Sequence, residues 1–321
     1  MKYLVTGGAG FIGSHLVESL LSDGHHVTVV DDYSTGSLDN LRHLLKNPRL
    51  EVIEGDVLKL PELEYLIVRS DMVFHLAAAV GVELVVRDPV RTIVTNVHGT
   101  ERVLTGAARK GTRVLVASTS EVYGKSEKEE FTESDDLLIG PPTHSRWSYA
   151  CSKLLDEFFC MAYYRSHKLP VTVVRLFNTV GPRQTGRYGM VLPRFVAKAL
   201  KNEPLQVYGD GSQSRCFCHV ADTVRALRLL SETKKSVGTV YNVGSTRETT
   251  IEGLAELVIK RMKSKSKIQY VPYEKAYEKG FEDMRRRLPD TGRLNKLTGW
   301  APRNSLEKII DDVAAFAGGK G

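Results

Sequence analysis

Two short segments of the sequence carry side chains that can exchange protons. The first, STSEVYG, offers the hydroxyls of Thr119 and Ser120 and the carboxylate of Glu121. The second, SYACSK, places Tyr149 four residues before Lys153. The surrounding WSYACSKLLDEFF has helical periodicity, so the tyrosine and the lysine are expected on one helix face. If both segments face one pocket, that pocket holds a proton acceptor, hydroxyl donors and an acid.

A glycine-rich segment lies near the start of the chain. In VTGGAGFIGSHL, Gly7, Gly10 and Gly13 stand between a strand pattern and a helix pattern. The first two glycines let backbone N–H groups approach a pyrophosphate, and the third lets the helix pack close to the sheet. About 20 residues later a second strand ends at Asp31 and Asp32, either of which can bind a ribose diol. Because a carboxylate there repels a 2′-phosphate, the sequence predicts NAD rather than NADP.

This cofactor gives the tyrosine a possible role. A tyrosine with an ordinary pKa near 10 is a poor base at neutral pH. The ammonium of Lys153 and the positive ring of oxidised nicotinamide both favour the phenolate of Tyr149. Although a Tyr-x-x-x-Lys pair alone is common on helix surfaces, its position behind the glycine loop and STSEVYG favours a catalytic role.

Apolar runs that alternate with helical patterns indicate the elements that position these residues. Strands are expected at 2–6, 26–32, 50–56, 72–78, 113–119 and 170–178, and helices include 11–24 and 95–111. The strands are continuously apolar, which is typical of a parallel sheet covered on both faces. The predicted fold is α/β, with a Rossmann-type doubly wound parallel sheet over residues 1–180. Residues 181–321 are expected to form a smaller α/β part that binds substrate at the carboxyl ends of the strands.

Composition narrows the class of protein. The 321 residues contain no run of about 18 apolar residues that would indicate a membrane span, and the chain begins with a strand pattern rather than a cleavable signal. The four cysteines lack zinc-site or disulfide spacing, so no metal and a reducing cytoplasm are expected. The net charge of +7 is spread along the chain, which favours solvated lysines over a nucleic-acid surface.

Taken together, these motifs resemble the extended short-chain dehydrogenases/reductases that act on nucleotide sugars. The resemblance rests on TGGAGFIG, Asp31, GDV, HLAA, Asn96, STSEVYG, YACSK, RLFNTVGP, VYGDGSQSR and a late GW. It implies that Tyr149 is the base, that Lys153 holds it and the nicotinamide ribose, and that Thr119 binds a sugar hydroxyl. It also implies a homodimer through a four-helix interface, consistent with the large apolar residues on more than one side of the helical patterns at about 92–110 and 147–165.

The resemblance extends to ligand-binding positions. The expected cofactor-binding residues are Gly7, Gly10, Phe11, Ile12, Gly13, Asp31, Asp32, Asp56, Val57, Leu76, Ala77, Ala78, Asn96, Tyr149 and Lys153. The expected substrate-binding residues are Asn178, Leu192, Arg194, Val207, Tyr208, Arg215 and Arg286, with Arg287 as a further anion binder. Asn178 would contact the nucleotide sugar and Arg215 its diphosphate, while the segments around Leu192 and Val207 would frame the base.

Three reactions begin with oxidation of the sugar at C4, and Glu121 helps to separate them. Thr119-Ser120-Glu121 resembles the sugar-nucleotide decarboxylases, whereas 4,6-dehydratases have an aspartate in place of Ser120, so dehydration is the least favoured. Decarboxylation of UDP-glucuronate is the first hypothesis. A 4-epimerase of UDP-glucose or UDP-glucuronate is the alternative, because GPPTHSRWSYACSK departs from the usual decarboxylase stretch. The arginine of many epimerases is also replaced, by Gly280.

A protein of a different class, a non-catalytic NAD-binding regulator, is also an alternative. The presence of Thr119, Tyr149 and Lys153 argues against it. Other reactive side chains have structural interpretations. His75 lies on an apolar strand and is expected in the core, His144 falls in a loop, and the alternating cysteines of RCFCHV are expected to be structural.

Overall fold

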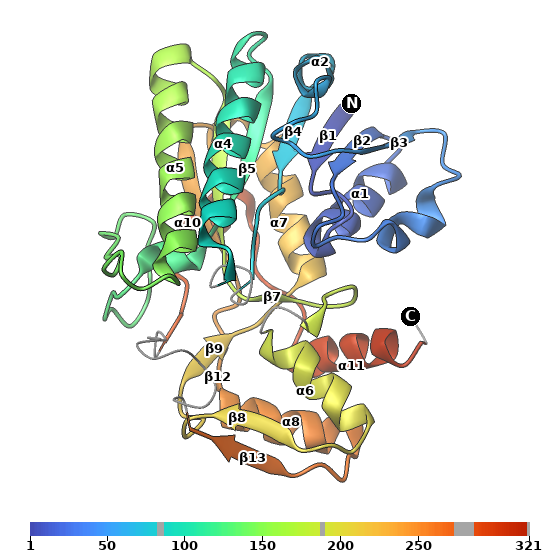
Figure 1. The fold of residues 1–321 in the computed structure, drawn as a ribbon, viewed down its shortest axis with the longest axis vertical. Coiled ribbons are helices and arrows are strands. Elements are labelled where there is room, and N and C mark those ends of the chain that lie inside the picture. The colour runs from blue at the N-terminus through green and yellow to red at the C-terminus, as the bar shows by residue number, and fades with distance from the viewer. Residues whose placement is uncertain (82–86, 187–189, 273–285, 320–321) are drawn as a thin grey trace.

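A seven-stranded parallel sheet forms the larger part of the molecule. The computed structural model describes residues 1–81, 87–186, 190–272 and 286–319. The strands run in the order β11-β6-β5-β4-β1-β2-β3. Of these, β1, β2, β3, β4 and β5 are labelled in Figure 1. Their bounds are β1 Lys2–Thr6, β2 His26–Asp31, β3 Leu50–Glu54, β4 Met72–His75, β5 Arg113–Thr119, β6 Val171–Leu176 and β11 Thr239–Val243. The prediction of a parallel α/β sheet is confirmed, with β11 as an edge strand that was not predicted.

Helices cover both faces of this sheet, as its apolar strands require. One face packs against α1 (Phe11–Ser22) and α7 (Val220–Glu232), and the other against α2 (Leu63–Arg69), α4 (Pro89–Ala108) and α5 (Trp147–His167). Short η1 (Leu38–Leu44), η2 (Ser120–Tyr123), η4 (Lys234–Ser236) and helix α10 (Gly292–Thr298) complete this part. Two apolar cores therefore sandwich the sheet.

A smaller part lies beyond one end of the large sheet (Figure 1). It contains α6 (Val191–Leu200), α8 (Ile251–Met262), α11 (Leu306–Ala317) and the strand pairs β8 (Leu205–Tyr208) with β13 (Ile268–Val271) and β9 (Ser214–Cys216) with β12 (Glu248–Thr250). Its helices and β8 share a third apolar core. The pair β7 (Thr179–Val180) with β10 (Cys218–His219) lies where the chain passes between the two parts. Because α7 and β11 return to the large sheet, the smaller part is built from separate stretches of chain.

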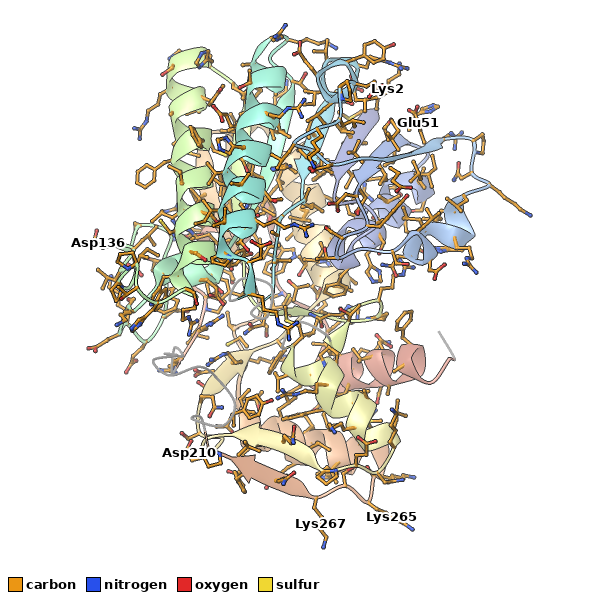
Figure 2. All side chains as sticks on the ribbon, in the orientation of Figure 1. Lys2, Glu51, Asp136, Asp210, Lys265 and Lys267 are labelled. Carbon is orange, nitrogen blue, oxygen red and sulfur yellow. The ribbon has the colours of Figure 1, made fainter. Side chains whose placement is uncertain are left out.

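Charged surface residues of this smaller part point outward. Lys265 and Lys267 project from its far end into solvent (Figure 2), as expected for the lysine-rich run of the sequence. Within the described residues, every helix is too short or too polar to cross a bilayer.

Candidate active site

A cavity of about 470 Å³ collects residues from the carboxyl ends of β1, β2, β4 and β5, from α5 and from the smaller part. Its size is typical of small-molecule sites, and its place at the strand ends is where open α/β sheets bind ligands. The predicted site residues line this cavity, with the exceptions of Asn96, Val207 and Arg286.

The loop between β1 and α1 leaves no space for side chains at its glycines. Gly7 has a φ of +72°, and a Cβ there would lie 2.7 Å from the backbone nitrogen of Ala77. A Cβ on Gly13 would lie 2.1 Å from the carbonyl oxygen of Gly7. Gly10 occupies the N-cap of α1 and has no side chain to cap the helix, and residues 10–13 at the start of the helix line the cavity. This bare helix N-terminus fits a dinucleotide pyrophosphate.

Asp31 ends β2 beside this loop. Its Oδ2 accepts a hydrogen bond from the Ala9 backbone N–H at 2.9 Å, and its Oδ1 accepts one from the Tyr33 N–H at 2.9 Å. Burial raises the pKa of the carboxyl, although these two N–H groups act in the opposite direction. The carboxylate is thus held at the cavity wall, where a carboxylate suits a ribose diol.

Tyr149 and Lys153 lie on the first turns of α5 and face the cavity together with Thr119. Thr119 is the last residue of β5, and its hydroxyl accepts a hydrogen bond from the Glu121 N–H at 3.2 Å, so it also caps η2. Burial raises the pKa of Tyr149, the carboxylate of Glu121 raises it further, and a hydrogen bond with Thr119 lowers it. The protein alone therefore favours a neutral phenol.

Glu121 lies between two arginines at the cavity wall, and we call these three residues the Glu121 cluster. Its Oε1 accepts a hydrogen bond from Arg287 Nη1 at 3.0 Å, and its Oε2 lies 3.5 Å from Arg146 Nη2. The two arginine side chains are only 9% and 8% exposed. Two nearly buried guanidinium groups therefore flank one carboxylate at this wall of the cavity.

Backbone pairing holds Arg287 in this place. Next to it, Leu288 O accepts a hydrogen bond from the Phe131 N–H at 2.8 Å, and Phe131 O accepts one from the Asp290 N–H at 2.9 Å. The Asn242 amide donates to Phe131 O at 2.8 Å and accepts from Tyr123 Oη at 2.7 Å. Since Tyr123 belongs to η2, one network fixes both the helix that carries Glu121 and the segment that carries Arg287.

The opposite end of the cavity is formed by residues of the smaller part. Arg194 donates to Tyr208 Oη at 2.7 Å, and its guanidinium lies 4.5 Å from the centre of that ring. Arg215 donates to Ser214 O at 2.7 Å. Asn178 and Leu192 also line the cavity. It combines a planar ring, an apolar wall and two cations, which suits a nucleotide.

Three predicted site residues lie elsewhere. Asn96 is buried behind the cavity, where its side chain accepts a hydrogen bond from the Ala79 N–H at 2.8 Å and donates to Ser152 Oγ at 3.0 Å. Val207 is in the core of the smaller part. Arg286 forms an ion pair with Glu248 at 2.6 Å, and the cavity is lined by the next residue instead. Gly280 lies outside the described residues.

Comparison with known proteins agrees with this geometry. The sequence model of the GDP-mannose 4,6 dehydratase family matches residues 4–313. The chain belongs to this family. It is 42% identical over 313 residues to UDP-N-acetyl-alpha-D-glucosaminuronate decarboxylase of Bacillus cytotoxicus, which covers 97% of this chain and 96% of the relative. It is 38% identical to UDP-glucuronic acid decarboxylase 1 of Danio rerio, over 98% of this chain and 72% of that protein.

Solved structures in the same family have the same fold. UDP-glucuronic acid 4-epimerase from Bacillus cereus, solved with UDP-glucuronic acid and NAD, superposes with a TM-score of 0.89 at 27% identity and covers 99% of both chains. The predicted resemblance to nucleotide-sugar enzymes of the extended short-chain dehydrogenase/reductase type is therefore confirmed.

Some residues at the site were not singled out from the sequence. Arg146 lies three residues before Tyr149, and Asp156 lies three residues after Lys153, with its Oδ2 2.6 Å from the lysine Nζ. Helical spacing from the two predicted catalytic residues is the signal that could have found both.

The remaining reactive side chains have structural surroundings. His75 is buried between the hydroxyls of Thr6 and Thr100, at 2.7 Å and 3.2 Å, and burial lowers its pKa to about 3, so it is neutral. His144 is not among the residues that line the cavity. Burial raises the pKa of the Cys216 and Cys218 thiols to about 12, so both stay protonated. The described residues contain no group of three potential metal ligands.

Proposed function

We propose that the protein is an NAD-dependent decarboxylase of a UDP-linked hexuronic acid, with UDP-glucuronate as the first substrate to test. The observation that carries the proposal is the Glu121 cluster, because it faces the same cavity as Tyr149 and Lys153. Its two guanidinium groups suit the C6 carboxylate of a hexuronic acid held with C4 near the tyrosine. The two decarboxylases with 42% and 38% identity support this reading.

The residues divide the chemistry as follows. Bound NAD supplies the hydride acceptor for C4. Tyr149 Oη takes the proton of the C4 hydroxyl, with Lys153 stabilising the phenolate and Thr119 orienting the hydroxyl. The resulting C4 ketone makes the C6 carboxylate a β-keto acid. The C5–C6 bond then breaks, carbon dioxide leaves, and the electron pair moves toward the C4 oxygen beside Tyr149 and Thr119. This oxygen takes back the proton that Tyr149 accepted, and the enol becomes the 4-keto pentose by transfer of a proton to C5.

The other predicted contacts bind the cofactor and the substrate. Gly7, Gly10 and Gly13 receive the cofactor pyrophosphate, and Asp31 binds its ribose. Arg215 binds the substrate diphosphate, while Leu192, Arg194 and Tyr208 frame the base. Asn96 supports the cofactor pocket indirectly, through the Ala79 backbone.

The enzyme is also proposed to act as a cytoplasmic homodimer. Leu155 and Phe158 on α5 are 42% and 66% exposed, and Val90, Ile93 and Val94 on the adjacent α4 are exposed as well. A second copy that packs its own α4 and α5 on this surface buries these side chains in a four-helix interface. The four cysteines are free thiols, which suits a reducing compartment.

Product analysis tests the proposed reaction. The purified protein with NAD is incubated with UDP-glucuronate, UDP-N-acetylglucosaminuronate and UDP-glucose, and the products are examined by mass spectrometry and NMR. Loss of one carbon dioxide to give a pentose or a 4-keto pentose supports the proposal. The second candidate, 4-epimerisation, is favoured by the 0.89 TM-score with a UDP-glucuronic acid 4-epimerase. An unchanged mass with inverted C4 identifies that reaction and overturns decarboxylation.

A further inference from the structure

A buried carboxylate lies directly against the lysine of the proposed active site. Lys153 Nζ and Asp156 Oδ2 are 2.6 Å apart, and the two side chains are 3% and 0% exposed. Both residues are on α5, three positions apart and so on one face. Removing a carboxylate from water costs several kcal/mol even when it is paired, and an apolar residue fills such a place at lower cost. This carboxylate therefore needs an explanation beyond packing.

The titratable and polar groups around the pair and the neighbouring Tyr149 come from four elements. They are His75 on β4, Thr100 on α4, Glu121 on η2, and Glu157 and Cys160 on α5. Burial keeps the histidine neutral and the thiol protonated. Glu157 is itself bound by Arg175, with Nε 3.0 Å and Nη2 2.8 Å from its carboxylate oxygens. Lys153 is consequently the cation that balances the charge of Asp156.

This pairing affects Tyr149, which lies one helical turn before Lys153. An ammonium close to a phenol normally favours the phenolate. Here the ammonium points to a carboxylate, so the pair is close to neutral as seen from the tyrosine. The raised pKa of Tyr149, due first to burial and then to the charge of Glu121, also includes a contribution from Asp156.

We propose that Asp156 is a positioning residue that holds the Lys153 ammonium away from Tyr149 and keeps the tyrosine a neutral phenol until NAD is bound. With the cofactor ribose in the cavity, Lys153 has hydroxyls to contact in place of Asp156, and its charge becomes available to the phenolate. The base is thus activated only when a hydride acceptor is present. The inference rests on the proposed function, because it takes Tyr149 as the base.

The test removes the charge and keeps the shape, with Asp156→Asn. In this variant the Lys153 ammonium does not have to break an ion pair before it contacts the cofactor. The variant is therefore expected to bind NAD about three- to tenfold more tightly than wild type. In single-turnover NADH formation, the acid limb of the pH profile is expected to move about one unit toward lower pH. Asp156→Glu, which restores the charge, is expected to return the NAD affinity and the acid limb of the pH profile toward their wild-type values.

A titration without substrate gives a readout that does not depend on turnover. The protein has 13 tyrosines, so the ultraviolet absorbance of Tyr149 tyrosinate is obtained as the difference from Tyr149→Phe in each background. In the cofactor-free protein, Asp156→Asn is expected to lower the pH at which Tyr149 ionises by about one unit, and NAD is expected to lower it in wild type.

The matched control is Asp136→Asn, which makes the same chemical change on the outside of the molecule (Figure 2). It is expected to leave NAD affinity and the tyrosinate titration unchanged. If Asp156→Asn fails to fold, Asp156→Ser, which leaves room for water beside the lysine, replaces it with the same expectations. Weaker NAD binding with an unmoved Tyr149 titration identifies Asp156 as purely structural and overturns the inference.

The outcomes also separate this inference from the proposed reaction. NAD affinity and tyrosinate absorbance require no sugar. A wild-type enzyme that epimerises instead of releasing carbon dioxide, but whose Asp156→Asn variant shows both shifts, overturns the decarboxylase proposal and supports the role of Asp156. If the wild-type enzyme releases carbon dioxide and the Asp156→Asn variant shows neither shift, the decarboxylase proposal is supported and the role of Asp156 is overturned.

Discussion

Replacement of Arg287 by glutamine tests whether the Glu121 cluster recognises a carboxylate. In wild type the cluster carries two positive charges and one negative charge, because Arg146 and Arg287 both lie against Glu121. Arg287→Gln makes the cluster neutral. A substrate carboxylate then loses one guanidinium partner. It is also repelled by the negative charge of Glu121, which Arg287 no longer balances.

The size of the effect follows from the charge that is lost. Two unit charges about 4 Å apart interact by about 4 kcal/mol at an effective dielectric constant of about 20. Partial desolvation and rearrangement offset some of this, so a loss of about 2–3 kcal/mol is expected. That corresponds to roughly 30- to 150-fold weaker binding of UDP-glucuronate. UDP-glucose, which has no charge at C6, is expected to change by less than about threefold.

Isothermal titration of the NAD-loaded protein with both nucleotides measures this difference. Arg286→Gln is the matched control, because the neighbouring arginine pairs with Glu248 away from the cavity lining. The double variant Glu121→Gln with Arg287→Gln has the wild-type net charge and is expected to recover most of the affinity for UDP-glucuronate. Equal losses for both nucleotides, or an equal loss in Arg286→Gln, would refute the reasoning.

The other expectations concern the cofactor, the base, the interface and the cluster carboxylate. Asp31→Ala is expected to narrow the preference for NAD over NADP, measured by fluorescence titration, and equal wild-type affinities contradict the ribose assignment. Tyr149→Phe is expected to lower turnover by about 10²–10⁴-fold with NAD affinity unchanged, as stopped-flow absorbance and binding assays will show. Phe158→Glu is expected to convert a dimer into a monomer in light scattering, and a wild-type monomer at micromolar concentration rejects the interface. Glu121→Gln is expected to lower KM for UDP-glucuronate and, more strongly, kcat for carbon dioxide release.

Much of the fold follows from local patterns in the sequence. The six predicted strands are all present, because most of them are apolar runs bounded by turn residues. The exception is the edge strand β3, which carries two glutamates. The edge strand β11 was missed although it is as long as β1 and β3; its first two residues are only partly buried and Asn242 interrupts its apolar run. Its place beside β6 depends on α7, which carries the chain back over the sheet, and no local pattern specifies that return.

The candidate site was predictable where function depends on spacing along one element. Tyr149 and Lys153 share a helix face, so their separation in sequence was sufficient. The choice between Arg286 and Arg287 was not predictable in this way, because neighbours in an extended segment face opposite sides. The pairing of Phe131 with Leu288 and Asp290 decides which one meets Glu121. The same alternation puts Tyr208 at the cavity and Val207 in the core.

The charge balance of the Glu121 cluster gives a physical reason for a carboxylate beside two arginines in a decarboxylase. Arginines that bind a substrate carboxylate too firmly oppose its loss, because the leaving carbon dioxide is neutral and the transition state carries less charge at C6. Glu121 pairs with both guanidinium groups and so weakens their interaction with the substrate carboxylate before reaction. Removal of its charge strengthens ground-state binding more than binding of the transition state, which lowers KM and kcat together. If Glu121 only supported the fold, its glutamine variant would show a lower Tm or a higher KM, with the ratio of carbon dioxide release to C4 oxidation unchanged.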